Sequence, residues 1–338
     1  MVFIVLSVLC AAESVSVLAP GNFYQGAFLG GIDGSEDRVT KENIDAYTKA
    51  ANRSPAWVYF SHEWSRGRDF PKETCGIIKG AGSTPFIRLM LRTSVKRGET
   101  NHDYNLVDIF TGKFDNDLRK WARGAKEYGA PLIVEFGTEA NASWFPWNGL
   151  WNGMEKGTSA FRYAYQQIVR ISRMEGAANI TWVFHVNSDD FPGETWNRME
   201  KYYPGDTYVD WVGVSVYGAK KPAETPAQDF RGLMDRVYAR MTESFKGKPV
   251  VLLEFGMTNN HPAVNQAEWA DAVLKDILSS RWKDLIGFAW WNDAWPNDGN
   301  PKNNTNMRIQ DNPDLQDVFK KNIGDNVYDL CVPVKKKE

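Results

Sequence analysis

Eight short apolar runs recur along this 338-residue chain at intervals of roughly 30 to 50 residues, and amphipathic stretches separate them. Short apolar runs bounded by turn residues are typical of strands that are buried on both faces. A strand–helix alternation repeated eight times predicts an α/β fold, a closed (β/α)8 TIM barrel that forms a single domain over residues 20–325. The predicted strands are residues 24–30, 56–61, 85–91, 131–137, 180–186, 211–217, 249–256 and 286–291.

The stretches between these runs have helical spacing. In residues 114–128, Leu118, Trp121 and Ala125 fall on one face of a helix, and residues 159–174 and 266–278 show the same pattern. The alternative is an open, doubly wound sheet, which would carry a glycine-rich phosphate turn after an early strand. Gly80-Ala81-Gly82 lacks both the third glycine and the preceding strand, so the barrel is favoured.

Composition narrows the classes of function. Hydrophobic residues make up 43% of the chain, which is enough for a large core, and the formal net charge of −2 argues against nucleic acid as a partner. The 4 histidines include no pair at metal-ligand spacing on one element, so we expect no metal and no cofactor. Many of the 14 tryptophans gather in sequence rich in glycine, asparagine and proline, which favours a binding surface over a place in the core.

The two ends of the chain are expected to lie outside the barrel. Residues 2–12 form an apolar run too short to span a bilayer, and this run resembles the hydrophobic part of a secretory signal with cleavage near Ala12. We therefore expect an export segment over residues 1–19, a secreted monomer without a membrane span, and a solvated tail over residues 326–338. Cys10 would leave with the signal or carry a lipid anchor, and Cys75 and Cys331 could pair or stay free.

Two glutamates follow predicted strands, at the face of the barrel where barrel enzymes keep their active sites. Glu139 follows the fourth strand and Glu254 ends the seventh. A pair of carboxyl groups about 5 Å apart supports cleavage of a glycosidic bond with retention, one group acting as the acid and the other as the nucleophile. Tyr217 ends the sixth strand, where its phenol could donate a hydrogen bond to Glu254 and orient it.

Aromatic and polar side chains near these strand ends are the candidates for contact with sugar. An indole ring offers a flat apolar face to the C–H groups of a sugar ring. Trp290 and Trp291 are adjacent in the eighth strand, so only one of them can face the barrel interior. The candidate substrate-binding residues are Trp144, Trp147, Trp290, Trp291, His62, Trp64, His185, Asn187 and Asn141.

The sequence around Glu139 resembles the acid/base motif of glycoside hydrolase family 26, and residues 249–256 resemble the nucleophile strand of the same clan. The resemblance covers about residues 20 to 325. It implies that Glu139 is the acid/base and Glu254 the nucleophile of a retaining, endo-acting enzyme. An endo-β-1,4-mannanase is the first expectation, with a mixed-linkage β-glucanase or a β-1,3-xylanase as alternatives. The residues that carry the motif are Glu139, Asn141, Trp144, Phe145, Pro146, Trp147 and Gly149.

Two departures from the family motif fall close to the acid. Thr138 stands where the family has histidine, and Glu135 stands where it usually has arginine. Both changes lie beside the expected −1 sugar position, so we predict a shift away from ordinary mannanase behaviour, toward a gluco- or xylo-configured β-glycan. Strand alternation turns Glu135 toward the barrel interior, where Arg88 on the third strand is its expected partner.

Two other classes of protein compete with an enzyme. A catalytically inactive carbohydrate-binding protein on the same barrel would have lost one of the two glutamates, and both are present. A sugar-binding protein of a transport system would need two α/β lobes joined by a hinge. The eight evenly spaced runs argue against that arrangement.

Overall fold

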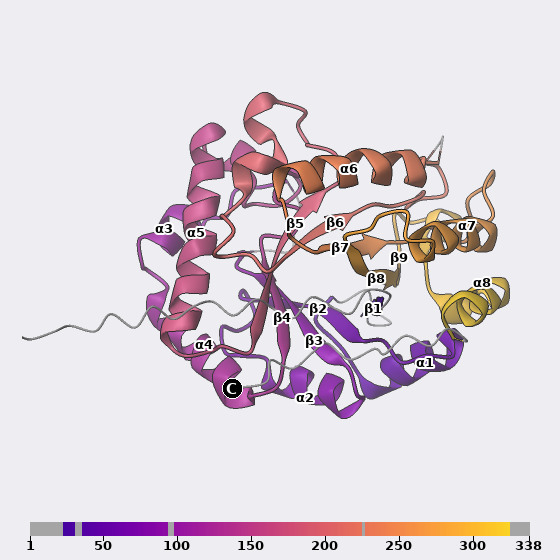
Figure 1. The fold of residues 1–338 in the computed structure, drawn as a ribbon, viewed down its shortest axis with the longest axis horizontal. Helices are drawn as coiled ribbons and strands as arrows, with labels where there is room; N and C mark the ends of the chain where they lie inside the picture. The colour runs from indigo at the N-terminus through magenta and orange to yellow at the C-terminus, as the bar shows by residue number, and fades with distance from the viewer. Residues whose placement is uncertain (1–22, 31–35, 94–97, 225–226, 325–338) are drawn as a thin grey trace, which may run out of the picture.

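Eight parallel strands close into a barrel in the order β1 to β8, and the long helices lie around it (Figure 1). The computed structural model describes residues 23–30, 36–93, 98–224 and 227–324. Each strand pairs with its neighbour in the sequence, and β1 pairs with β8 to close the ring. The predicted (β/α)8 barrel is therefore confirmed.

The boundaries of the elements agree closely with the periodicity of the sequence. The strands are β1 Tyr24–Leu29, β2 Trp57–Glu63, β3 Thr84–Met90, β4 Leu132–Phe136, β5 Ile180–Asn187, β6 Trp211–Ser215, β7 Val250–Phe255, β8 Leu285–Asn292, β9 Ala294–Trp295 and β10 Thr305–Asn306. The α-helices are α1 Lys41–Ala51, α2 Lys72–Gly80, α3 Leu106–Phe110, α4 Asp115–Tyr128, α5 Glu155–Met174, α6 Phe230–Ser244, α7 Gln266–Leu278 and α8 Pro313–Phe319.

Helix α4 shows how the sequence dictates a helix and its packing. Leu118, Trp121 and Ala125 form the predicted apolar face and are buried. Asp115 in the first turn complements the helix dipole, and Gly129 ends the helix with φ at 70°, a left-handed conformation that glycine adopts without strain. Asp115 and Gly129 thus favour the start and the end of the helix, and burial of its apolar face stabilises it against the barrel.

The lower barrel interior is filled with large aromatic side chains. The rings of Trp57 on β2 and Trp211 on β6 are 6.3 Å apart, a contact between strands on opposite sides of the barrel that must cross its interior. Trp57 fits because Gly26 and Gly287 are next to it: a Cβ atom at either position would lie within 2.8 Å of the indole. This packed floor leaves only the carboxyl-terminal mouth of the barrel for a site.

Strand β7 contains one extra residue just before its end. Its pairing with β6 passes from Leu252 directly to Glu254, and its pairing with β8 is irregular over the same stretch. Such a bulge changes which side of the sheet the following side chains face, and bulges are frequent next to active sites. Here the bulge directly precedes Glu254 and determines where its carboxyl group points.

Several expectations concern features outside the barrel. No helix in the described ranges is long and apolar enough to span a membrane. Cys75 is a buried, free thiol. The expected export segment at residues 1–19, Cys10, Cys331 and the expected tail at 326–338 lie outside the described residues.

Candidate active site

Glu254 at the end of β7 is held by one residue that follows the adjacent strand β6 and by one on β3, across the barrel. The Tyr217 hydroxyl donates a hydrogen bond of 3.0 Å to its Oε2, as predicted. Nη2 of Arg88, from β3, lies 3.5 Å from its Oε1. The side chain is almost completely buried, so these two contacts fix the orientation of the carboxyl group.

The charge state of Glu254 is set by opposing effects. Burial raises the pKa of Glu254 to about 7, the positive charge of Arg88 opposes this rise, and the negative charge of Glu139 adds to it. The two glutamates are therefore close enough for the charge of one to act on the other. The raised pKa means that Glu254 is protonated to a larger extent near neutral pH than an ordinary glutamate.

Glu139 reaches the barrel mouth through a turn rather than on the strand. Strand β4 ends at Phe136, and two residues with positive φ follow: Gly137 at 74° and Glu139 at 47°. A glutamate rarely adopts this left-handed conformation, and such strain is concentrated at functional sites. Nε1 of Trp144 donates a hydrogen bond of 2.6 Å to Oε2 of Glu139 and fixes its side chain.

The turn before Glu139 depends on a glycine at position 137. A Cβ atom there would lie 2.2 Å from the ring of Phe161 on α5. We expect Gly137→Ala to lower the free energy of unfolding by roughly 2–5 kcal/mol, because it combines left-handed strain with overpacking. Gly129→Ala is the matched control: its φ is 70°, but the nearest atoms lie 3.8 Å from the added Cβ, so only the strain of roughly 1–2 kcal/mol applies. Equal losses in urea unfolding would contradict this account.

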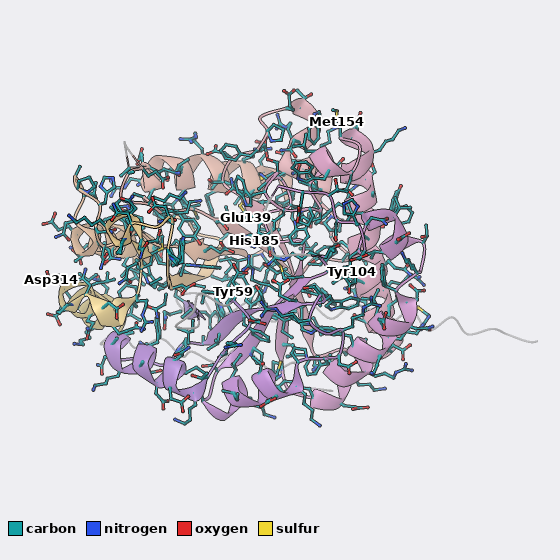
Figure 2. All side chains as sticks on the ribbon, turned by 180° about the vertical axis from the view of Figure 1, so that it is seen from behind. Tyr59, Tyr104, Glu139, Met154, His185 and Asp314 are labelled. Atoms are coloured by element: carbon teal, nitrogen blue, oxygen red, sulfur yellow. The ribbon has the colours of Figure 1, made fainter. Side chains whose placement is uncertain are left out.

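A buried polar network lies directly below the two glutamates. Glu135 on β4 accepts a hydrogen bond of 2.6 Å from the Tyr59 hydroxyl, and its Oε2 is 2.9 Å from Nδ1 of His185 on β5. Nε of Arg88 lies 3.6 Å from Oε1 of Glu135, which confirms the predicted partner. Figure 2 shows Tyr59, His185 and Glu139 together near the centre of the molecule. One guanidinium group thus connects Glu135 to Glu254.

The charges of this network reinforce one another. Burial alone would raise the pKa of Glu135, but His185, Arg88 and Thr138 outweigh burial and hold the pKa below its usual value. Burial would lower the pKa of His185, but Glu135 and the two other glutamates outweigh it and raise that pKa. The network therefore keeps Glu135 ionised, and a positive charge on His185 is favoured beside it.

Thr138, which replaces the histidine of the family motif, has no access to the site. It is fully buried, and its hydroxyl donates a hydrogen bond to Oε1 of Glu135. Nε of Arg88 is also within hydrogen-bonding distance of this hydroxyl, at 3.3 Å. Any hydroxyl of a sugar at the −1 position must therefore be bound by other groups.

Of the two adjacent tryptophans, Trp291 faces the interior. Its ring stacks on Phe28 with a centroid distance of 3.7 Å, and the Arg88 guanidinium lies 5.4 Å from its centroid. The prediction that Trp290 binds substrate is wrong, because its indole is fully buried, packs on Phe319 of α8 and donates to the Met307 carbonyl. Strand alternation forces this division between the two neighbours.

Other candidate residues also prove to support the scaffold. Trp147 is buried under the loop after β4, where its indole donates to the Thr138 carbonyl. Asn141 is fully buried and joins the loops after β4 and β5 through the backbone of Asn187. His185 is likewise enclosed. These three predicted contacts with sugar are corrected, because burial leaves no atom of them free for a ligand.

The predictions that His62 on β2 and Trp64 just after it bind substrate are also wrong, because both side chains lie outside the barrel interior. His62 points away from the barrel axis, and Nε1 of Trp121 on α4 lies 3.3 Å from its Nδ1. Trp64 is buried against the ring of Tyr104. Side chains on β2 alternate, and Tyr59 faces the interior, so His62 must face the helices.

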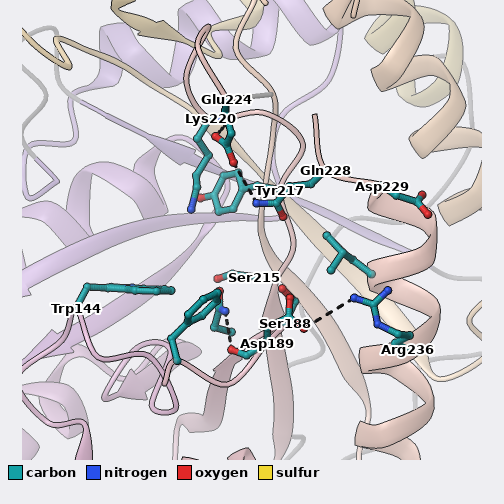
Figure 3. A pocket seen from close by; sticks show the side chains of 13 residues that line it. Trp144, Ser188, Asp189, Ser215, Tyr217, Lys220, Glu224, Gln228, Asp229 and Arg236 are labelled. Carbon is teal, nitrogen blue, oxygen red and sulfur yellow. Dashed lines mark hydrogen bonds and ion pairs between the residues drawn. The ribbon is translucent and has the colours of Figure 1, made fainter. Parts of the chain in front are cut away.

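A cleft of about 420 Å³ is lined by Trp144 and Tyr217, the side chains that hydrogen-bond Glu139 and Glu254 (Figure 3). Trp144, Asn187 and Tyr217 all line it, so these three predicted residues are brought together. The rest of the lining was not predicted: it comes from the loops after β5 and β6, from the end of β6 and from α6, near where barrel enzymes place binding residues. The unpredicted lining residues are Ser188, Asp189, Phe191, Ser215, Lys220, Glu224, Gln228, Asp229, Leu233 and Arg236.

The arrangement suits acid–base and nucleophilic chemistry on a sugar. In the described part of the chain, no cluster of three or more histidine, cysteine, aspartate or glutamate side chains could hold a metal ion. Comparison with known proteins identifies the family. A sequence model of glycosyl hydrolase family 26 matches residues 94–300. The chain belongs to this family.

Relatives of known name act on different polysaccharides. The chain is 26% identical to Endoglucanase H of Acetivibrio thermocellus over 324 residues, which is 95% of this chain and 33% of that protein. It is 25% identical to a mannan endo-1,4-β-mannosidase of Bacillus subtilis over 53% of this chain and 44% of that protein. A β-1,3-xylanase of Vibrio sp. is 31% identical over 32% of this chain and 22% of that protein. The chain thus spans less than half the length of these relatives.

Solved structures share the barrel. The catalytic domain of a family 26 endo-β-1,4-mannanase from Bacillus sp. JAMB-750 superposes with a TM-score of 0.63 at 18% identity, covering 90% of this chain and 86% of that one. A family 26 β-mannanase of Bacteroides ovatus gives 0.62 at 16% identity, covering 92% and 93%. At these identities the likeness establishes the fold and nothing finer.

Proposed function

We propose that this protein is a retaining endo-β-glycanase in which Glu139 is the acid/base and Glu254 the nucleophile. The observation that carries the proposal is that two buried carboxyl groups meet at one barrel mouth, each with its own hydrogen-bond donor: Trp144 for Glu139 and Tyr217 for Glu254, which also forms an ion pair with Arg88. Relatives in the same family with endo-acting names support the class of reaction.

The reaction follows from the functions that the family resemblance implies for the two glutamates. Glu139 gives its proton to the glycosidic oxygen as the bond to the anomeric carbon breaks. Ionised Glu254 attacks the anomeric carbon from the opposite face and forms a glycosyl–enzyme ester. Glu139, now ionised, takes a proton from water, whose oxygen displaces Glu254. The product then keeps the configuration of the substrate.

A gluco-configured β-glycan is the proposed substrate. Endoglucanase H matches nearly the whole chain, whereas the mannosidase and the xylanase match shorter parts. The enclosed Thr138 hydroxyl adds support, because a site that lacks one hydrogen bond to a sugar hydroxyl loses about 0.5–1.5 kcal/mol, up to roughly tenfold in rate. Mannan is the second candidate, because several family members of this fold are named mannanases. We extend the proposal to export from the cell, on the basis of the apolar run at residues 2–12, and to a monomer.

The test is a panel of polysaccharides of equal chain concentration: barley β-glucan, carboxymethylcellulose, galactomannan and β-1,3-xylan. We expect the highest kcat/KM, measured by release of reducing ends, on a gluco-configured member. If galactomannan exceeds every other substrate by several orders of magnitude, the protein is an ordinary mannanase. Proton NMR of the first product formed decides between retention and inversion of the anomeric centre.

A further inference from the structure

Lys220 occupies a rigid position at the edge of the cleft. Its backbone N–H donates a hydrogen bond of 2.8 Å to Oε2 of Glu224, and its carbonyl accepts one from the Thr305 hydroxyl. The preceding carbonyl, of Ala219, accepts a hydrogen bond of 2.9 Å from the backbone of Thr258. The main chain at position 220 is thus fixed from three sides, which limits where the side chain can reach.

The ammonium group of Lys220 lies over two aromatic rings. Its Nζ is 5.1 Å from the ring centroid of Tyr217 and 6.0 Å from that of Trp144 (Figure 3). Cation–π attraction at these distances stabilises the ammonium above the rings. Both rings belong to the side chains that hydrogen-bond the two glutamates. Lys220 therefore borders the space that a substrate would occupy beside the reacting bond.

Lys220 also lacks a carboxylate partner within ion-pair distance among the residues that the structure describes. The acidic residues lining the cleft are engaged elsewhere. Glu224 binds backbone N–H groups and Gln228, and Asp229 accepts a hydrogen bond from the first turn of α6. Asp189 lies 3.8 Å from Arg236. The described acids that line the cleft therefore form no ion pair with the Lys220 ammonium, which can still bind a carboxylate.

The position of Trp144 tells which part of a substrate Lys220 would meet. The indole donates directly to Glu139, the proposed acid, which must contact the oxygen of the leaving group. A sugar that rests on Trp144 is therefore on the leaving-group side of the bond. The Lys220 ammonium, above the same ring, would lie next to that sugar.

We propose that Lys220 recognises a carboxylate carried by the sugar on the leaving-group side, so that the enzyme favours anionic β-glycans over neutral ones of the same backbone. This proposal rests on the proposed function. A carboxylate in a partly enclosed cleft would gain a charge-assisted hydrogen bond to Lys220. The selectivity is expected to be roughly fivefold, as is usual for an ion pair that solvent partly screens.

The experiment compares two derivatives of whichever backbone the wild-type protein cleaves: a carboxymethylated and a hydroxyethylated one with equal substitution. The variants are Lys220→Met, Lys220→Arg and, as the matched control, Lys221→Met, which removes the same charge from an exposed neighbour. The measured quantity is the ratio of kcat/KM on the anionic substrate to that on the neutral one, at low and high salt.

We expect the wild type and Lys221→Met to show the same ratio of kcat/KM values. In Lys220→Met this ratio should be about fivefold lower, and in Lys220→Arg it should stay close to that of the wild type. High salt should reduce the ratio in the wild type and leave it unchanged in Lys220→Met. Equal ratios in Lys220→Met and Lys221→Met would overturn the inference. If the wild type cleaves no β-glycan, the proposed function itself fails, a distinct outcome.

Discussion

Glu254→Ala is expected to abolish turnover on polysaccharides and on activated aryl glycosides alike, lowering kcat by more than roughly 10⁴-fold. Glu139→Ala should lose roughly 10²–10⁴-fold on polysaccharides but little on an aryl glycoside with a good leaving group. The reason is chemical: a nucleophile is needed whatever leaves, whereas a general acid is dispensable when the departing oxygen is stable without a proton.

Steady-state kinetics with dinitrophenyl glycosides separates the two functions. In Glu139→Ala the glycosyl–enzyme ester should accumulate, since its hydrolysis lacks a base, and this should give a burst of dinitrophenol followed by a slow phase. Glu194→Ala, an exposed glutamate away from the cleft lining, is the control and should behave as wild type. Equal losses for Glu139→Ala and Glu254→Ala on the activated glycoside would refute the assigned functions.

The fold could be predicted from the sequence because burial in a barrel imposes a regular spacing on the apolar residues of its strands and helices. Predicted strand 180–186 corresponds to β5, and predicted helix 266–278 has the bounds of α7. Both predictions rest on the spacing of apolar residues. A strand buried on both faces is apolar throughout, and a helix buried on one face is apolar every three to four residues. The position of Glu135 inside the barrel, beside Arg88, followed from the same alternation.

Finer features of the site depended on local departures from regular structure. The left-handed turn at Glu139 and the bulge before Glu254 leave no periodic signal, because each involves a single residue. Whether a loop tryptophan is only partly buried, like Trp144, or fully buried, like Trp147, depends on how the loop packs upon itself. Lys220 gave no sequence signal either, since a lysine after a strand is normally a solvated residue.

Loss of Arg88 should strongly lower stability. It lies buried between Glu254, Glu135 and Glu36, and Arg88→Met would leave carboxylates in the barrel without their shared cation. We expect the free energy of unfolding to fall by about 3–5 kcal/mol at pH 8. Arg88→Met combined with Glu135→Gln should recover part of this loss, because one of the uncompensated charges is then absent.

The pH dependence of this loss distinguishes electrostatics from packing. Without Arg88, the pKa of Glu254, already raised to about 7 by burial, moves further up, because the effect that lowers it is gone. A carboxyl group with a raised pKa in the folded state costs no stability below its unfolded value. It destabilises the protein progressively as the pH rises from the unfolded pKa to the folded pKa, and the loss is constant above that. The difference between Arg88→Met and wild type should therefore be small at pH 4 and largest at pH 8, in urea unfolding.

Arg92→Met provides the matched comparison, because Arg92 is also buried and pairs with Glu63, with no contact to Glu254. We expect it to lose comparable stability. The acid limb of kcat/KM should move to higher pH only in Arg88→Met, since ionised Glu254 is the attacking form and its pKa depends on Arg88. A limb that stays in place in Arg88→Met, despite the loss of stability, would show that Arg88 supports the barrel without setting the charge of Glu254.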